Sequence, residues 1–234
     1  MLKITETEVF GWKAAIRGMR NAHESWDKSD SGYKWEDIDW WNEVFIIGPN
    51  DLTLMKKLVA AGTDHSKFMR MIHVQCDWEA PLYWWKEADT YKVGTVRNSC
   101  STMHKITAHE FDMDMFSHEH LFDFCPSEHH NSTDILKITI EHLNAMRKVF
   151  NSLDQDDPLR KEYWWQLIQL LPPSYNQKAT MDLNYQVLRN MYNARKNHKQ
   201  DEWRLDFCNW VKSLPYSELI TMTKEELLES IKEE

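Results

Sequence analysis

The stretch MIHVQCDWEAPLYWWKEADTYK, residues 71–92, carries the clearest structural signal in this 234-residue sequence. Apolar and polar residues alternate through its first half, as in a strand that buries one face. The apolar positions are Ile72, Val74, Cys76 and Trp78. Pro81 then suits the first turn of a helix. We therefore expect a strand, a corner and a helix in succession.

Outside this stretch, one further strand is expected at 2–10 and the remaining elements are helices. Asp51 is the expected N-cap of a helix that stops at Gly62. The helix at 132–153 has an apolar stripe of Ile135, Ile138, Leu143, Met146 and Val149/Phe150. The expected helices cover 11–26, 51–62, 132–153, 157–173, 180–197, 201–214 and 223–234. Few strands, many helices and no βαβ alternation predict an α+β fold. We expect one domain over 1–222, followed by a charged C-terminal helix or tail at 223–234.

Composition restricts the partners and the compartment. The net charge of −9 argues against a general nucleic-acid-binding or anionic-membrane-binding surface. No apolar run approaches membrane-spanning length. The four cysteines form no CxxC pair, which favours reduced thiols. We expect a cytoplasmic protein without nucleic-acid or membrane partners.

A polar loop, ADTYKVGTVRNSCSTMH at 88–104, follows the expected helix. Gly94 permits a turn that brings backbone N–H groups and short hydroxyls close to a phosphate. The alternative is a structural loop whose Ser and Thr side chains cap helix ends. Cys100 is a candidate nucleophile because Lys92 and Arg97 are near in sequence, although a lone cysteine is more often inert.

Six of the eleven histidines fall between His104 and His130. One interpretation is a metal site that combines histidines with an aspartate. Its candidate ligands are His118, His120, His129, His130, Asp112 and Asp114. The spacing matches no standard zinc pattern, and a hydrated loop or lid is the alternative.

The expected helix at 180–197 carries Asn184, Asn190 and Arg195. Amides and an arginine along one helix can hold a nucleotide, with the guanidinium binding phosphate through two N–H groups. The alternative is a solvated helix face. His198 and Glu202, like Gln200 and Arg204, are spaced at i,i+4.

Three segments together resemble the flavin-dependent thymidylate synthase family, from about Gly62 to Trp210. DHSKFMRMIHVQCDWEAPLYWWKEADTYK is similar to the family's His-x-Ser/Thr-Pro-Phe stretch, strand, Ala-Pro corner and helix. The polar loop occupies the place of the Arg-His-Arg-x-x-Ser motif. LLPPSYNQKATMDLNYQVLRNMYNARKNHKQDEWR is similar to the family's Leu-Pro, Asn, Leu-Arg and His-x-Gln-x-Glu pattern.

The sequence departs from the family pattern at several positions. Thr90, Tyr91 and Lys92 stand in place of Arg-His-Arg, and Gln186 stands where an arginine is common. Lys92 offers a phosphate a point charge but no planar fork. Lys67 replaces the proline of the first motif.

The resemblance implies a small, mostly antiparallel sheet packed with many helices, and a homotetramer that binds FAD. It further implies reductive methylation of dUMP to dTMP, with methylenetetrahydrofolate and reduced pyridine nucleotide (NADPH) as co-substrates. Residues expected at substrate are Lys86, Lys92, Ser101 and Arg195. Residues expected at flavin are Ser66, Thr90, Tyr91, Asn184, Asn190 and His198. No catalytic side chain is assigned. The alternative is a protein that keeps the fold and binds a nucleotide without turnover.

Overall fold

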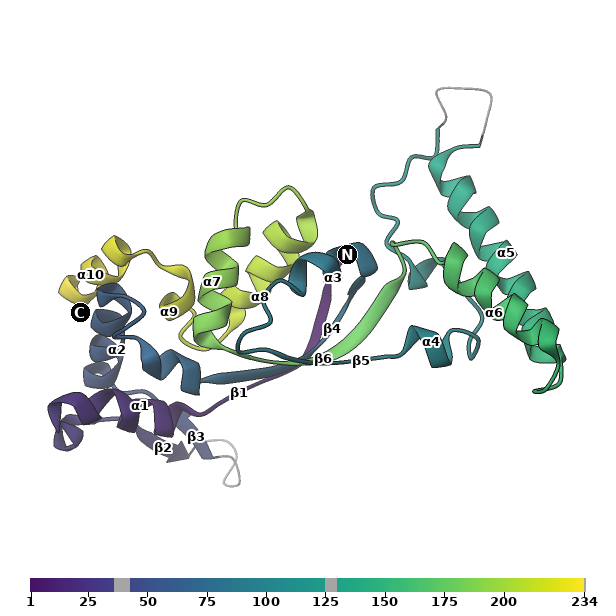
Figure 1. Ribbon diagram of the computed structural model, residues 1–234. Coiled ribbons are helices and arrows are strands. Elements are labelled where there is room, and N and C mark those ends of the chain that lie inside the picture. The colour runs from purple at the N-terminus through teal and green to yellow at the C-terminus, as the bar shows by residue number, and fades with distance from the viewer. Residues whose placement is uncertain (36–42, 125–129, 234) are drawn as a thin grey trace. The chain divides into compact units, whose positions relative to one another are not determined.

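The computed structural model describes residues 1–35, 43–124 and 130–233 (Figure 1). The fold is α+β with a small antiparallel sheet, as expected. Four strands hydrogen-bond in the order β1-β4-β6-β5, and β2 pairs with β3 in a separate antiparallel hairpin. The strands are β1 (Lys3–Phe10), β2 (Gly32–Trp35), β3 (Glu43–Ile46), β4 (His73–Pro81), β5 (Val96–Ser99) and β6 (Asn176–Asn184).

The chain forms two compact units. Unit 1 comprises Met1–Lys3, Trp78–Thr90 and Asn98–Ala179, and unit 2 comprises Ile4–Asp77, Tyr91–Arg97 and Thr180–Glu234. In the part of the chain that the structure describes, no helix is both long and apolar enough to cross a membrane.

Strand β4 confirms the alternation seen in the sequence. Ile72, just before the strand, and Val74 and Cys76 within it are almost completely buried, whereas Gln75 is exposed. Helix α3 (Leu82–Ala88) then begins directly after Pro81, one residue later than expected. The expected strand at the N-terminus is also present, as β1.

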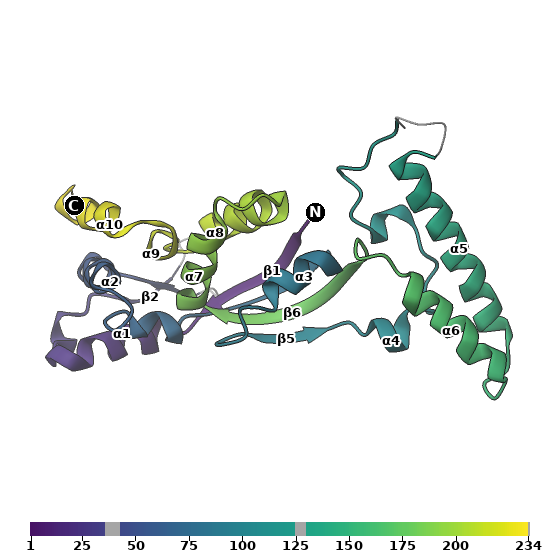
Figure 2. The same ribbon diagram turned by 45° about the horizontal axis from the view of Figure 1, so that its top comes forward.

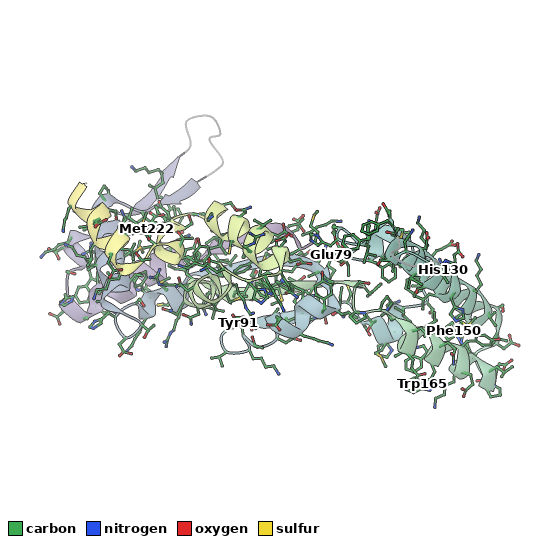
Figure 3. All side chains as sticks on the ribbon, turned by 90° about the horizontal axis from the view of Figure 1, so that it is seen from above. Glu79, Tyr91, His130, Phe150, Trp165 and Met222 are labelled. Carbon is green, nitrogen blue, oxygen red and sulfur yellow. The ribbon has the colours of Figure 1, made fainter. Side chains whose placement is uncertain are left out.

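Unit 1 is built on a helical hairpin of α5 (Ser132–Ser152) and α6 (Pro158–Leu170). Arg160 joins the two helices, because its guanidinium donates to the carbonyls of Phe150 and Leu153 at 2.9 and 2.6 Å. Figure 3 labels Phe150 on this hairpin, and the Arg160 guanidinium lies 4.0 Å from its ring centroid. The contacts satisfy carbonyls that the end of α5 leaves without helical partners.

The apolar stripe expected on α5 was wrong in part. Leu136, Ile140 and Leu143 face the core, while Ile135 and Ile138 are 53% and 45% exposed. The buried set is spaced at four and three residues, which is also a valid helical face. It packs with residues of the preceding loop and of α6, namely Ile106, Phe111, Phe116 and Leu167.

Unit 2 contains most of the remaining helices. They are α1 (Trp12–Arg20), α2 (Pro49–Ala61), α7 (Tyr185–Arg195), the π-helix η5 (Glu202–Phe207), α8 (Cys208–Ser213), α9 (Glu218–Thr221) and α10 (Lys224–Glu233). Helix α2 packs against α10, and both lie side by side in Figures 1 and 2. Leu227 of α10 is completely buried, so the charged C-terminal segment has an apolar anchor.

Two expectations about helix boundaries in unit 2 were wrong. The segment 180–197 is not one helix, because β6 runs to Asn184 and α7 begins at Tyr185. Asp51 is not an N-cap, because α2 starts two residues earlier, at Pro49. The carboxylate of Asp30, from a preceding loop, instead accepts from the backbone N–H groups of Asn50 and Asp51 at 2.9 and 3.1 Å.

The Asp51 side chain forms a buried ion pair with Arg20 instead. The Arg20 Nε donates to Asp51 Oδ1 at 2.6 Å, and both side chains are nearly inaccessible to solvent. The hydroxyls of Ser29 and Ser31 donate to the other oxygen at 2.7 and 2.6 Å. Burial raises the pKa of Asp51, but the hydrogen bonds from Ser31, Ser29 and Arg20 outweigh it and lower that pKa below its ordinary value. The pair therefore ties α1, α2 and the loop around residues 29–31 together.

Replacing Asp51 with Ala should destabilise the fold by about 3–5 kcal/mol, because Arg20 would remain buried without its counter-ion. Chemical denaturation at pH 7, followed by far-UV circular dichroism, measures this difference.

Asp27→Ala is the matched control, because Asp27 is exposed and a surface change is expected to stay within about 0.5 kcal/mol. Because the pKa of Asp51 is lower in the folded protein than in the unfolded chain, its ionised carboxylate stabilises the fold at pH values above the unfolded pKa of about 3.9. This stabilisation is lost as the pH falls through the folded-state pKa. The gap between wild type and Asp51→Ala should consequently narrow below about pH 4. Equal stability of the two proteins at pH 7 would contradict this account.

Candidate functional site

The candidate site is organised by the corner between β6 and α7. Asn184 ends the strand with extended backbone and caps the helix, since its side-chain oxygen accepts from the Val187 N–H at 3.0 Å. The Asn184 amide nitrogen also donates to the Gly94 carbonyl, at 3.5 Å. Asn184 is 93% buried, with only 7% of its surface exposed. One side chain therefore connects the start of α7 to the polar loop.

The loop turns at Gly94, as expected. Its φ of +81° lies in the region that favours glycine. A Cβ atom there would lie 3.0 Å from Val187 Cγ2 and 3.1 Å from Asn184 Nδ2. The turn is also held by Thr95, whose hydroxyl donates to the Tyr91 carbonyl at 2.6 Å. The loop thus packs directly on the first turn of α7.

A chain of amide and hydroxyl groups joins α7 to the residue before the short helix η3 (Lys67–Met71). The Ser66 hydroxyl donates to Gln186 Oε1 at 3.1 Å, and Gln186 Nε2 donates to Asn190 Oδ1 at 3.2 Å. Ser66 and Gln186 are buried, whereas Asn190 is exposed. Gln186, which stood out in the sequence only as a departure from the family pattern, therefore connects Ser66 and Asn190, two residues that were expected to contact the flavin.

Arg195, at the end of α7, contacts two neighbouring aromatic rings. Its Nε donates to the Tyr91 hydroxyl at 2.9 Å. Its guanidinium carbon is 5.4 Å from the Tyr91 ring centroid and 4.9 Å from that of Trp203. Both separations are within the range of cation–π attraction. Figure 3 labels Tyr91 on the loop that follows α3. Trp203, which is fully buried, was not expected at the site.

The segment after α7 is a turn and not a regular helix. The His198 N–H donates to the Arg195 carbonyl at 2.9 Å, and its Nδ1 accepts from the Gln200 N–H at 3.2 Å. Glu202 is buried, so the i,i+4 spacing with His198 does not mark a surface pair. Among the described residues, Gln200 Oε1 is a buried acceptor without a hydrogen-bond partner. It lies in the same sequence motif as His198 and Glu202.

The other expected site residues carry local structural contacts. In unit 1, the Thr90 hydroxyl donates to the Glu87 carbonyl at 2.7 Å, and the Ser101 hydroxyl accepts from the His104 N–H at 3.2 Å, capping the short helix α4 (Thr102–Lys105). Lys86 is exposed on α3. In unit 2, Lys92 is exposed on the polar loop. The observed bonds of Thr90 and Ser101 are those expected if the loop is structural and its hydroxyl side chains cap helix ends. The roles of these residues in ligand binding stay predictions.

The two other chemical interpretations receive little structural support. The exposed Cys100 is held by its backbone, with its N–H donating to the Lys178 carbonyl at 2.9 Å. Within residues 1–35, 43–124 and 130–233, no three His, Cys, Asp or Glu side chains are placed to hold a metal ion. His118 Nδ1 instead lies 2.8 Å from the Phe116 carbonyl oxygen. His129 lies outside the described residues.

In chemical terms, unit 2 offers a cation beside two aromatic rings, a pair of hydrogen-bonded amides and a glycine turn. A guanidinium suits a phosphate or carboxylate. Side-chain amides donate to and accept from the edges of flat heterocycles. This combination is suited to a nucleotide, and it includes no nucleophile with a paired base.

Replacing Gly94 with Ala should destabilise unit 2 by about 1–2 kcal/mol for the left-handed backbone alone, and by more where the new methyl group presses on Val187. Gly32→Ala is the control, because Gly32 has no positive φ and nothing within 4 Å of its Cβ position. Denaturant unfolding measures both variants, and a loss at Gly94 of no more than about 1–2 kcal/mol would contradict close packing of the loop on α7.

Comparison with known proteins relates this fold to flavin-dependent thymidylate synthases. No protein-family model and no curated protein sequence matches the chain. A structure of flavin-dependent thymidylate synthase ThyX from Helicobacter pylori, complexed with FAD and dUMP, is similar with a TM-score of 0.61 and 12% identity, over 93% of this chain and 96% of that one. A second ThyX structure from Helicobacter pylori with FAD and dUMP has a TM-score of 0.61 and 13% identity, over the full length of both chains. At these identities the likeness shows a shared fold.

Proposed function

We propose that this protein is an FAD-dependent thymidylate synthase-like enzyme. It would methylate dUMP reductively to dTMP, with methylenetetrahydrofolate as the carbon donor and NADPH as the reductant. The observation that carries the proposal is the set of polar contacts made by α7, in which Gln186 links Ser66 to Asn190 and Arg195 donates to Tyr91. The likeness to structures that hold FAD and dUMP supports it.

The residues present fit a flavin nucleotide. Gln200 Oε1 is a buried acceptor in need of a donor, and the Asn190 amide lies on the exposed side of α7. Bound FAD would supply the hydride chemistry that amino-acid side chains lack. On this proposal, Ser66, Asn184, Asn190 and His198 orient the flavin, and Thr90 and Tyr91 contact it from the polar loop.

On this proposal, cationic side chains bind the phosphate of the substrate. A guanidinium has five N–H donors, and in Arg195 the Nε donor is committed to Tyr91. The ring contacts of Tyr91 and Trp203 restrict the direction in which the remaining nitrogens point, which lowers the entropy lost when a phosphate binds. We assign Lys92 of unit 2 to the same substrate. The substrate contacts of Lys86 and Ser101, in unit 1, stay predictions from the sequence, and we propose a homotetramer in the cytoplasm.

A second candidate function follows from Tyr91 itself. A tyrosine stands where the family has histidine, and its hydroxyl and ring both contact Arg195. If this contact persists when ligand is present, the protein binds a nucleotide without flavin-dependent turnover. The two functions differ in whether dUMP is converted to dTMP when FAD and the co-substrates are present.

Replacing Arg195 with Ala should weaken dUMP binding roughly 10- to 100-fold, because a charge-assisted hydrogen bond contributes about 1.5–3 kcal/mol. Isothermal titration calorimetry of the FAD-treated protein measures the dissociation constant.

Arg204→Ala is the control, because Arg204 is an exposed arginine nearby in sequence that pairs with Asp201 at 2.6 Å. It should leave dUMP affinity unchanged. Equal dUMP affinity of Arg195→Ala and wild type, with both proteins folded, would remove Arg195 from the site. A wild-type protein that binds no dUMP would overturn the proposed substrate.

A further inference from the structure

A pocket lies within unit 2, between α1 and the β2–β3 hairpin. Its volume is about 650 Å³, which is within the usual range for sites that bind small molecules. Figures 1 and 2 both show α1 beside β2. The lining side chains that matter here are Lys13, Arg17, Trp26, Tyr33 and Phe45. None of the residues proposed for flavin or dUMP lines this pocket.

Aromatic rings form one part of its wall. Trp26 and Tyr33 are each 51% exposed, which is unusual for side chains with so much apolar surface. The Trp26 ring is nevertheless oriented, because its Nε1 donates to Asn21 Oδ1 at 2.9 Å. Tyr33 packs edge-on against Phe45, with ring centroids 5.1 Å apart and planes at 77°. The pocket thus presents oriented aromatic surface to solvent.

Cations form another part of the wall. Lys13 and Arg17 are one turn apart on α1 and both are exposed. Lys13 Nζ lies 5.8 Å from the Tyr33 ring centroid, so charge and ring are close together. Among the described lining residues there is no Asp or Glu, although the whole chain has a net charge of −9. Local positive charge on an acidic protein favours an anionic ligand at this place.

The base of the pocket is fixed. Arg20, Ser29 and Ser31 line it, and all three are hydrogen-bonded to the buried Asp51 carboxylate. Arg20 also donates to the Ser25 and Lys28 carbonyls, at 3.0 and 3.1 Å. A ligand that enters the pocket would therefore meet preorganised loop backbone, which reduces the entropic cost of binding.

We propose that this pocket binds a flat aromatic molecule that carries an anionic group, of about the size of a mononucleotide. The ring stacks on Trp26 or Tyr33, and the anion pairs with Lys13 and Arg17. Phosphate and carboxylate satisfy the same cations, so the shared chemistry is an aromatic anion. The site is separate in its residues from the one proposed for dUMP.

Calorimetric titration of the Arg195→Ala protein tests this pocket in a background where the proposed dUMP site is weakened. The probes are AMP, indole-3-acetate, adenosine and inorganic phosphate. We expect AMP or indole-3-acetate to bind better than adenosine or phosphate alone, and the better probe shows whether phosphate or carboxylate is preferred.

The double variant Lys13→Ala/Arg17→Ala and the single variant Trp26→Ala, built in the same background, should each weaken that binding about tenfold or more. Exposed Lys105→Ala is the control and should have no effect. Unfolding curves establish that each variant is folded.

Two results would overturn the proposal. One is no binding of either aromatic anion, and the other is binding that the Lys13/Arg17 and Trp26 variants leave unchanged. Because these titrations use no dUMP and a protein that lacks the Arg195 side chain, failure here leaves the proposed function standing. Failure of dUMP binding likewise leaves the proposal for this pocket standing.

Discussion

The hydrogen bonds of Asn184 are the constraint on which the candidate site depends. A strand ends and a helix begins at this residue, and its side chain caps the helix while its amide contacts the Gly94 turn. An uncapped helix start would leave buried N–H groups without partners, which is costly. The cap thus determines where α7 begins, and with it the positions of Gln186, Asn190 and Arg195 along the helix. The same contact places the polar loop so that Tyr91 meets Arg195.

The strand at 73–81 and the corner after it could be predicted from the sequence, because a period of two over nine residues has few other structural solutions. The boundary at Asn184 could not. TMDLNYQVLRNMYNARKN is compatible with a helix throughout, and only pairing within the sheet makes its first five residues extended. The misplaced cap at Asp51 has a similar cause, since the capping carboxylate comes from Asp30, twenty residues earlier.

Part of the candidate site could also be predicted. Arg195 and Tyr91 were both expected, and they are in direct contact. Trp203 and Gln186 were not expected, because a buried tryptophan and a buried glutamine resemble ordinary core residues until their partners are known. The spacing of Gln186 and Asn190 at i,i+4 was the available signal. Thr90 and Ser101 form the helix-capping bonds that the structural alternative expected, and their ligand roles stay predictions.

The proposed function requires that the polar loop and α7 hold a flavin. Visible absorbance of the purified protein, before and after addition of FAD and removal of unbound cofactor, tests it most directly. The account predicts a retained flavin spectrum, with FAD identified by chromatography after the protein is denatured. A protein that stays colourless after FAD treatment would contradict it and would show that the Tyr91–Arg195 contact does not belong to a flavin site.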